Sequence, residues 1–167
     1  VSVLATEGAL EINQACVAGG CFPGDAAGFP VTIVNQGNYV LTSNLTLDDT
    51  NLTAIQVDSD NVLIDMKGFG IFGENVCTGA QDDCKASGGG AGVESLPTRR
   101  NITVRDGLIR GMGFAGINIG EQSTVENVVT EHSWRVGIFV RAGSTVRNAN
   151  SNFNGFLGME AHESRLV

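Results

Sequence analysis

A repeat of 21 residues runs through the second half of the chain and limits what the chain can fold into. Gly116, Gly137 and Gly158 are each separated by 21 residues. The same spacing separates the members of a second column, which consists of Val104, Val125, Val146 and Val167. Two independent columns with one period indicate a solenoid, in which each structural repeat packs only against its neighbours.

Between the repeated glycines, the chain consists of short segments broken by Gly or Asn, such as 123–127 and 137–140. Helices need apolar residues at spacings of three and four, so this pattern predicts strands and turns instead. One coil has no second layer against which it can bury its valines and isoleucines. We therefore expect an all-β fold in which the coils stack, with equivalent side chains in columns about 4.8 Å apart.

Polar residues in the same register agree with stacked coils. Asp106, Asn127 and Asn148 form one column, in which Asx side chains can satisfy the turn backbone and continue from coil to coil. Opposite charges alternate in two further columns, which contain Arg105, Glu126 and Arg147 in one case and Arg110 and Glu131 in the other. Cross-strand pairing favours this alternation, so most charged residues are interpreted as ladder partners.

The coils, together with residues 9–16, 21–25, 28–33 and 37–45, resemble bacterial secreted right-handed parallel β-helix repeat proteins of the pectate lyase-like superfamily. The resemblance covers nearly the whole chain. It implies a right-handed parallel β-helix, or β-solenoid, with coils of about 21 residues and a short N-terminal cap. Because the superfamily includes polysaccharide lyases, hydrolases, epimerases and adhesins, the resemblance implies a fold rather than one activity.

The chain divides into a cap and a coil region. Residues 1–30 do not repeat and are predicted to form the N-terminal cap, with the first cysteine pair and a weakly helical pattern over 7–15. Residues 31–167 are predicted to form the coils, and an insertion at 74–91 with the second cysteine pair interrupts them. Loops on a rigid scaffold often carry function, but a disulfide-closed insertion without a further role is at least as well supported.

The four cysteines fall into two close pairs. Cys16 and Cys21 form one pair, and Cys77 and Cys84 form the other. Two local disulfides are favoured over a four-thiolate zinc site, which would need the pairs to converge across about 60 residues and lacks the usual cysteine spacing. Paired cysteines favour an oxidising compartment, so the chain is predicted to be secreted, extracellular or on a cell surface.

Charge and hydropathy bear on the classes of partner. Ten basic and eighteen acidic residues give a formal net charge of −8 at pH 7, whereas nucleic-acid binding draws its affinity from clustered Lys and Arg. No apolar run approaches the roughly 18 residues that span a bilayer. The expected partners are therefore other copies of the chain or an extracellular polysaccharide, with no nucleic acid and no membrane span.

Candidates for chemistry lie in the C-terminal coils. Polysaccharide lyases need a base and a cation that neutralises the sugar carboxylate, and glycosidases need two carboxyl groups. The catalytic candidates are His132, Arg141 and His162, since Arg141 is expected directly under His162. Trp134, Arg135 and Arg141 are candidates for sugar binding. For each of these residues a structural role, as a ladder partner or as a lid over a turn, is favoured.

No cofactor is predicted. Asp82 and Asp83 could bind Ca²⁺ with loop carbonyls, but two adjacent carboxylates point apart and supply too few ligands. The glycines at 88–90 lack the Lys and the strand-to-helix context of a phosphate-binding loop.

The C-terminal coil is expected to be unfinished. Val167 continues the column of Val104, so the last coil would expose apolar side chains and unpaired strand edges at Leu166 and Val167. Two interpretations remain open: the natural chain continues, or copies join head to tail into a fibre. In the second interpretation, Val1 and Val3 of one copy would help to supply the strand that completes the next copy.

The sequence therefore predicts a secreted, non-catalytic structural or adhesive β-solenoid that assembles head to tail. The grounds are the unfinished coil and the lack of a convincing acid–base pair. The alternative is a polysaccharide-active β-helix, a lyase, an epimerase or a carbohydrate-binding protein, that uses the face from Glu131 to Arg141 together with His162.

Overall fold

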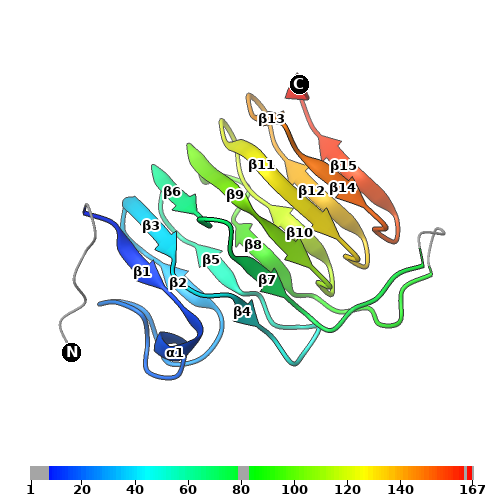
Figure 1. Ribbon diagram of the computed structural model, residues 1–167. Helices are drawn as coiled ribbons and strands as arrows, with labels where there is room; N and C mark the ends of the chain where they lie inside the picture. Colours follow the sequence, from blue (N-terminus) through cyan, green and yellow to red (C-terminus); the bar gives the residue numbers. More distant parts are fainter. Residues whose placement is uncertain (1–7, 79–82, 164, 167) are drawn as a thin grey trace.

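The chain folds into a parallel β-solenoid of about five turns, as the repeat predicts. The computed structural model describes residues 8–78, 83–163, 165 and 166. Figure 1 shows the strands stacked along one axis, with β1 (Leu10–Ile12) at one end and β15 (Leu157–Ala161) at the other. Among the described residues, no helix is long and apolar enough to cross a bilayer.

Two sheets form the walls of the solenoid. The six-stranded sheet contains β2 (Val31–Ile33), β5 (Ile55–Val57), β8 (Ala91–Ser95), β10 (Ala115–Asn118), β12 (Val136–Val140) and β15. The ten-stranded sheet contains β1, β3 (Gly37–Leu41), β4 (Leu45–Thr46), β6 (Val62–Asp65), β7 (Gly70–Phe72), β9 (Ile102–Arg110), β11 (Thr124–Glu131), β13 (Thr145–Arg147), β14 (Asn150–Asn152) and β16 (Arg165–Leu166). Neighbouring strands are parallel in both sheets, so each rung of the solenoid crosses from one wall to the other.

The strand register confirms the 21-residue period in the second half of the chain. Val104 pairs with Val125, and Val125 pairs with Val146. Earlier rungs are longer, since Val31 pairs with Ile55, 24 residues further on. The period of 21 therefore describes the C-terminal rungs, whereas the rungs of the whole chain have about 24 residues.

The last rung corrects the prediction that Val167 continues the valine column. Val146 pairs instead with Leu166, 20 residues further on. The segment between β15 and β16 is one residue shorter than the repeat requires, because Val140 still pairs with Ala161 at a spacing of 21. Leu166 therefore occupies the column, and it is 53% exposed.

A column of Asx side chains marks a left-handed bend in successive rungs, inside β9 and β11 and after β13. Asp106, Asn127 and Asn148 have φ values of 60°, 52° and 48°, in the left-handed region that Asn and Asp tolerate. Asn127 Nδ2 donates a hydrogen bond of 2.9 Å to Asp106 Oδ1, which confirms the predicted Asx column. His132 and Phe153 form another left-handed column, with φ values of 56° and 52°.

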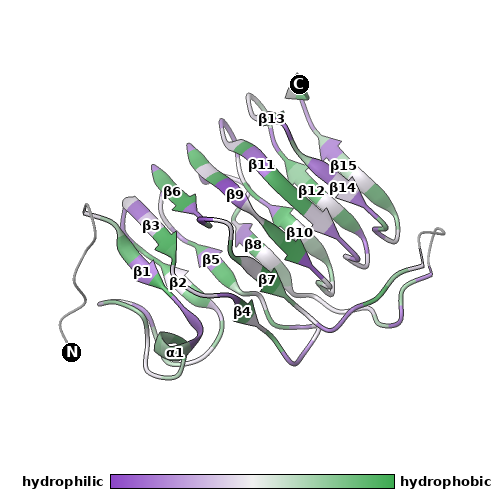
Figure 2. Ribbon diagram, in the orientation of Figure 1, coloured by the Kyte–Doolittle hydropathy of each residue, from purple (hydrophilic) through white to green (hydrophobic). Residues whose placement is uncertain are grey.

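One inner column changes from apolar to polar along the solenoid axis, while others, such as that of Val104, stay apolar. Figure 2 shows the mixture of apolar and polar residues along the strands. Ile71 and Ile109 pair across β7 and β9, and Ile109 then pairs with Thr130 and Thr130 with Ser151. The hydroxyls of Thr130, which is buried, and of Ser151, which is half-buried, hydrogen-bond over 2.8 Å. In this column the C-terminal rungs therefore place a polar pair where earlier rungs bury isoleucines.

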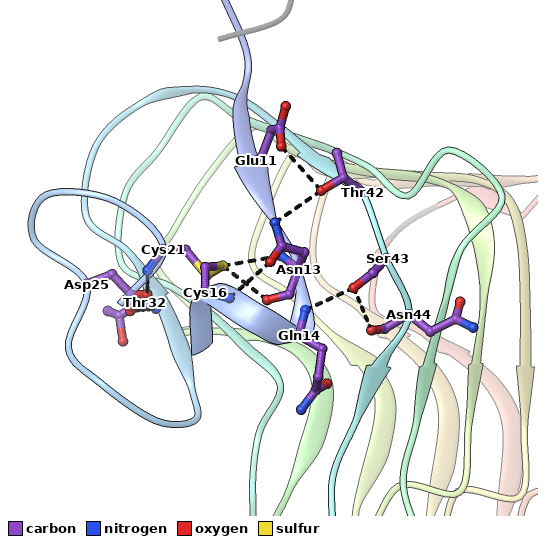
Figure 3. The surroundings of a disulfide bond; sticks show 10 residues. All are labelled: Glu11, Asn13, Gln14, Cys16, Cys21, Asp25, Thr32, Thr42, Ser43 and Asn44. Atoms are coloured by element: carbon purple, nitrogen blue, oxygen red, sulfur yellow. Dashed lines mark hydrogen bonds between the residues drawn. A yellow bond between two sulfur atoms is a disulfide. The ribbon is translucent and has the colours of Figure 1, made fainter. Parts of the chain in front are cut away.

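A disulfide-linked cap lies at the N-terminal end of the core (Figure 3). The helical pattern at 7–15 is a wrong prediction there, because 10–12 form the strand β1 and the only helix in the described part of the cap is α1 (Gln14–Val17). Asn13 begins α1, since its Oδ1 accepts a hydrogen bond from Cys16 N. Asp25 accepts hydrogen bonds from the backbone of Cys21 and of Thr32, which ties the loop to β2.

The segment between β7 and β8 is called the strap below, and Figure 1 shows its described parts, which include 74–78 and 83–90, outside the stacked strands. Asn75 N donates to Gly111 O over 2.9 Å, which holds the strap on a turn of a later rung. The Cys77–Cys84 disulfide closes the strap. Both predicted disulfides are therefore confirmed, and no described cysteine is free to form the alternative zinc site.

Candidate functional site

The outer face of the six-stranded sheet carries a cavity of about 420 Å³ near its C-terminal end. We call it the outer-face cavity, and its lining residues are Phe114, Asn118, Arg135, Val136, Phe139, Arg141, Glu160 and His162. They belong to three neighbouring strands, β10, β12 and β15, and to the turns beside them. Residues one rung apart lie on adjacent strands about 4.8 Å apart, so the repeat brings these side chains together.

The strand register sets the rows of the cavity. Phe139 of β12 pairs with Asn118 of β10 on one side and with Glu160 of β15 on the other. His162 N donates to Val140 O over 3.1 Å, which places His162 one rung above Arg141. The predicted stacking of Arg141 and His162 is therefore confirmed.

Apolar residues form the floor of the cavity. Phe114 and Phe139 pack against a small buried cluster of Ala91, Ala115 and Val136. Val136 is 3% exposed. The two aromatic rings therefore present apolar surface to the cavity from a rigid sheet.

Arg141 is held in place by several contacts. Its Nη1 donates to Asn118 Oδ1 over 3.0 Å and to Ile119 O over 2.9 Å. Its guanidinium carbon lies 4.6 Å from the centroid of the Phe139 ring, a cation–π contact. Burial lowers the pKa of Arg141, and the negative charge of Glu94 opposes this effect. The side chain keeps one orientation because amide, carbonyl and ring all contact it.

A chain of hydrogen bonds connects Arg141 to residues of the three preceding rungs. Asn118 Nδ2 donates to Glu94 Oε1 over 3.1 Å. Thr53 Oγ1 donates to Glu94 Oε2 over 3.2 Å. Asn118, which is 8% exposed, therefore links the carboxylate of one rung to the guanidinium of another.

His162 and Glu160 form a pair at the edge of the cavity. His162 Nε2 lies 2.8 Å from Glu160 Oε1. The His162 ring meets the Phe139 ring edge to face, with centroids 5.3 Å apart. An imidazole and a carboxylate therefore lie at the same cavity as Arg141.

Arg135 stands at the opposite end of β12. Its guanidinium carbon lies 5.9 Å from the centroid of the Phe114 ring and 5.8 Å from that of the Phe156 ring. These three residues are spaced by 21, so they come from successive rungs. Arg135 is exposed and lines the cavity between the two rings.

His132 and Trp134 do not line the outer-face cavity. His132 Nδ1 accepts a hydrogen bond of 3.1 Å from Cys77 N, and its ring stacks on Phe153 with centroids 5.6 Å apart. Trp134 is half-buried, and its carbonyl oxygen lies 3.8 Å from Cys84 Sγ. Both residues belong to the turn that the strap covers, so of the two histidine candidates it is His162 that reaches the cavity.

The structure describes only some of the residues predicted to bind metal or to take part in assembly. Asp83 accepts a hydrogen bond from the Thr78 hydroxyl inside the strap. Among the described residues, no group of three or more His, Cys, Asp or Glu side chains could hold a metal ion. Four predicted residues lie outside the described part of the chain, namely Val1, Val3, Asp82 and Val167.

Sequence reasoning names only three of the eight residues that line the cavity. Phe114, Asn118, Val136, Phe139 and Glu160 are not named as site residues, although Phe114 is one rung from Arg135 and Asn118, Phe139 and Glu160 form one row across three strands. The 21-residue spacing between Phe114 and Arg135, and between Asn118 and Phe139, is the signal that could have found them. A site in a solenoid is found by reading across the rungs, because neighbours in sequence point to opposite faces.

Comparisons of the chain with protein-family models, with curated proteins and with solved structures found no match. The strand register itself identifies the fold as a parallel β-solenoid. Function therefore has to be argued from the geometry of the outer-face cavity.

Proposed function

We propose that this chain is a secreted, non-catalytic adhesive β-solenoid, related to the pectate lyase-like superfamily, that binds carbohydrate in the outer-face cavity. The observation that carries the proposal is the cavity of about 420 Å³ on a rigid sheet, with apolar rings and converging polar groups. Ligand sites are typically concave and apolar, with a few polar groups that set orientation.

The chemistry of the lining suits a sugar. A sugar ring has apolar C–H faces and a rim of hydroxyl groups, so it needs rings to stack on and groups to hydrogen-bond with. Phe114 and Phe139 supply the rings. Asn118 and Glu160 supply amide and carboxylate groups on the same wall. Phe139, Asn118 and Glu160 lie on strands, which hold their side chains more firmly than loops do, and Phe114 directly precedes β10.

The spacing of the carboxylates supports binding without hydrolysis. Glu94 and Glu160 are separated by Asn118 and Phe139 in the strand register, which makes three strand spacings. At about 4.8 Å per spacing their backbones are about 14 Å apart. Glycosidases place their two carboxyl groups roughly 5 to 10 Å apart, closer than these strands bring them.

The disulfides support the proposed location. Cys16–Cys21 and Cys77–Cys84 are both formed. Such bonds persist in oxidising environments such as the extracellular space.

A glycan array carrying neutral, uronate-containing and sulfated oligosaccharides tests the proposal. We expect the chain to bind at least one class of glycan, and Phe139→Ala to weaken binding about tenfold or more because it removes the central ring. The control is Phe153→Ala, which removes an exposed ring outside the cavity. Absence of binding to every glycan, or equal losses in the two variants, would contradict the proposal.

A second candidate function, a polysaccharide lyase, is favoured by the His162–Glu160 pair beside Arg141. In this function His162 would abstract the proton next to a uronate carboxylate, and Arg141 would neutralise that carboxylate. The electron pair of the broken C–H bond forms a carbon–carbon double bond as the neighbouring glycosidic C–O bond breaks, and the leaving oxygen takes a proton from water. The double bond, conjugated with the carboxylate, absorbs ultraviolet light. Absorbance that rises on uronate polymers, is lost in His162→Ala and is kept in His132→Ala would establish the lyase and overturn the non-catalytic proposal.

Head-to-tail assembly of copies of this chain is a separate proposal. It is supported by exposed apolar side chains on the last described rung, where Phe153 is 55%, Phe156 48% and Leu157 37% exposed. Leu157 lies on β15, the edge strand of the six-stranded sheet, and Phe156 directly precedes it; an edge strand can pair with another chain. Sedimentation velocity across a hundredfold range of concentration tests the proposal: assembly predicts a rising sedimentation coefficient that Leu157→Lys suppresses, and a concentration-independent monomer would contradict it.

A further inference from the structure

Arg135 differs from the ladder arginines Arg105 and Arg147 in what its guanidinium contacts. Arg105 binds Asp65, and Arg147 binds Glu126, in both cases through ion pairs. Among the described residues, no carboxylate forms an ion pair with Arg135, and its charged group instead lies between two phenylalanine rings at 5.9 and 5.8 Å. A guanidinium carries five N–H donors, and Arg135 is exposed where it lines the cavity.

The two rings organise Arg135 without using its hydrogen-bond donors. Cation–π contacts act on the face of the guanidinium and leave the N–H groups at its edge available. Because Phe114 and Phe156 belong to the rungs on either side, the side chain is restrained from both directions. Because the Arg135 side chain is already restrained, it loses less conformational entropy when a ligand binds.

The remaining lining determines what kind of ligand this cation would meet. The cavity offers apolar contact at Val136 and Phe139 and a second, half-buried cation at Arg141. The carboxylate of Glu160 is already paired with His162 at 2.8 Å. Arg135 therefore brings a positive charge to the cavity, although the chain as a whole carries a net charge of −8.

We propose that Arg135 is the specificity-determining residue of the cavity and binds an anionic group, a carboxylate or a sulfate, on the glycan. This inference rests on the proposed carbohydrate binding. A guanidinium binds both groups through two parallel N–H···O contacts, so the shared chemistry is a pair of anionic oxygens.

Binding to dextran, carboxymethyl-dextran and dextran sulfate tests the inference, because the three polymers share one backbone and differ in charge. Affinity is measured by isothermal titration calorimetry at about 0.05 M and 0.5 M NaCl. We expect Arg135→Gln to weaken binding of the charged polymers about 10- to 100-fold at low salt, which is the loss of one charge-assisted contact. The carboxymethyl and sulfate forms separate the two sources of the anionic group.

The matched control is Arg110→Gln. Arg110 is an exposed arginine on the other sheet that forms no ion pair within the described residues and lines no part of this cavity. Equal losses in the two variants would overturn the inference, since binding would then depend on net charge. If Arg135→Gln changes no affinity while the glycan array still shows binding that depends on Phe139, the inference fails and the proposed function stands. If the array shows no binding at all, both fail.

Discussion

The charged side chains on the outer faces of the two sheets make different contacts. On the ten-stranded sheet the charges alternate in sign from strand to strand, in the column Asp65, Arg105, Glu126 and Arg147. On the six-stranded sheet, Arg135 and Arg141 contact phenylalanine rings instead. The first face neutralises its own charge and stabilises the stack, whereas on the second Arg135 lines a cavity without an ion pair to any described residue.

This difference shows how one repeat can produce both a scaffold and a site. The period decides which residues become neighbours on adjacent strands. The residue types in a column then decide whether those neighbours satisfy one another. A column of alternating charges does so, while the column Phe114, Arg135 and Phe156 leaves the donors of its arginine unused.

The largest expected effect comes from a change that breaks the scaffold under both faces. A Cβ on Gly137 would overlap Ser151 Oγ and lie 2.5 Å from Thr130 Oγ1, in the interior between the sheets. We expect Gly137→Val to lower the free energy of unfolding by about 3 kcal/mol or more, the upper range for overpacking. Urea denaturation measures it. Gly89→Ala is the control, since a Cβ added at Gly89 would have no heavy atom within 4 Å; equal stabilities of the two variants would contradict the packing argument.

The next effect tests whether the charged column is structural. Asp65 is 3% exposed and accepts hydrogen bonds from Arg105 Nε at 3.2 Å and from Arg105 Nη2 at 2.8 Å. Its Oδ1 also accepts a hydrogen bond from the backbone of Lys67. We expect Asp65→Asn to cost about 2 to 3 kcal/mol, because a buried charged acceptor is lost. Asp48→Asn, at an exposed site, should change the free energy of unfolding by less than about 0.5 kcal/mol.

The pH dependence of stability sharpens the same point. Burial acts to raise the pKa of Asp65, but the hydrogen bonds from the Lys67 backbone and from Arg105 outweigh burial and lower it. A lowered pKa in the folded state means that the ionised carboxylate stabilises the fold above its unfolded pKa of about 3.9, and that this contribution disappears as the pH falls through the folded pKa. The stability gap between the wild type and Asp65→Asn should therefore stay constant from about pH 6 to 7 and shrink below about pH 4. Thermal denaturation across that range measures it, and a gap that widens in acid would contradict the assignment.

The sequence is a good guide to the fold because solenoid contacts are local between rungs. The columns of Val104 and of Asp106 can be read from a single period, and the strand register confirms both. The prediction fails where the period changes. A shortened segment after β15 moves Leu166 into the place expected for Val167, and the strand β1 forms at Leu10–Ile12 within a weakly helical pattern. Single-residue changes in turn length leave almost no trace in composition.

The site can be predicted only in part, because a cavity depends on which way side chains point. Arg135, Arg141 and His162 are recognisable as charged residues of the last coils, and they do line one cavity. His132 and Trp134 are candidates beside them because they are close in sequence. The turn before β12 directs them toward the strap, a contact with a segment about 50 residues earlier that no local pattern encodes.

A smaller effect tests the rigidity of the second face. Asn118 joins Glu94 to Arg141 by hydrogen bonds of 3.1 and 3.0 Å. We expect Asn118→Ala to cost about 1 kcal/mol of stability, the usual contribution of such contacts, and to release Arg141 from its orientation. Chemical denaturation gives the first quantity, and the line width of the Arg141 side-chain N–H signal in NMR gives the second. Asn150→Ala, at an exposed position on β14, should alter neither.

The smallest expected effect lies at the exposed end of the charged column. Arg147 Nε donates to Glu126 Oε2 over 2.7 Å, but the Arg147 side chain is 55% exposed. Water and salt screen such a pair, so a double-mutant cycle with Glu126→Gln and Arg147→Gln should give a coupling energy of about 0.5 kcal/mol or less, falling further in about 1 M NaCl. The control cycle uses Arg110 and Glu131, which are register partners on the same sheet and form no ion pair within the described residues. Its coupling should be close to zero.

These two cycles, compared with a cycle on the buried pair Asp65 and Arg105, separate burial from register as the source of the stabilisation in the charged column. If register alone created the coupling, both pairs would couple equally, because both consist of an arginine and a glutamate on paired strands of β9, β11 and β13. If burial dominates, the coupling energy should fall from the Asp65 end of the column, where the carboxylate is covered, to the Arg147 end, where the guanidinium meets water. A coupling at Glu126 as large as that at Asp65 would show that the column stabilises the stack along its whole length, independently of burial.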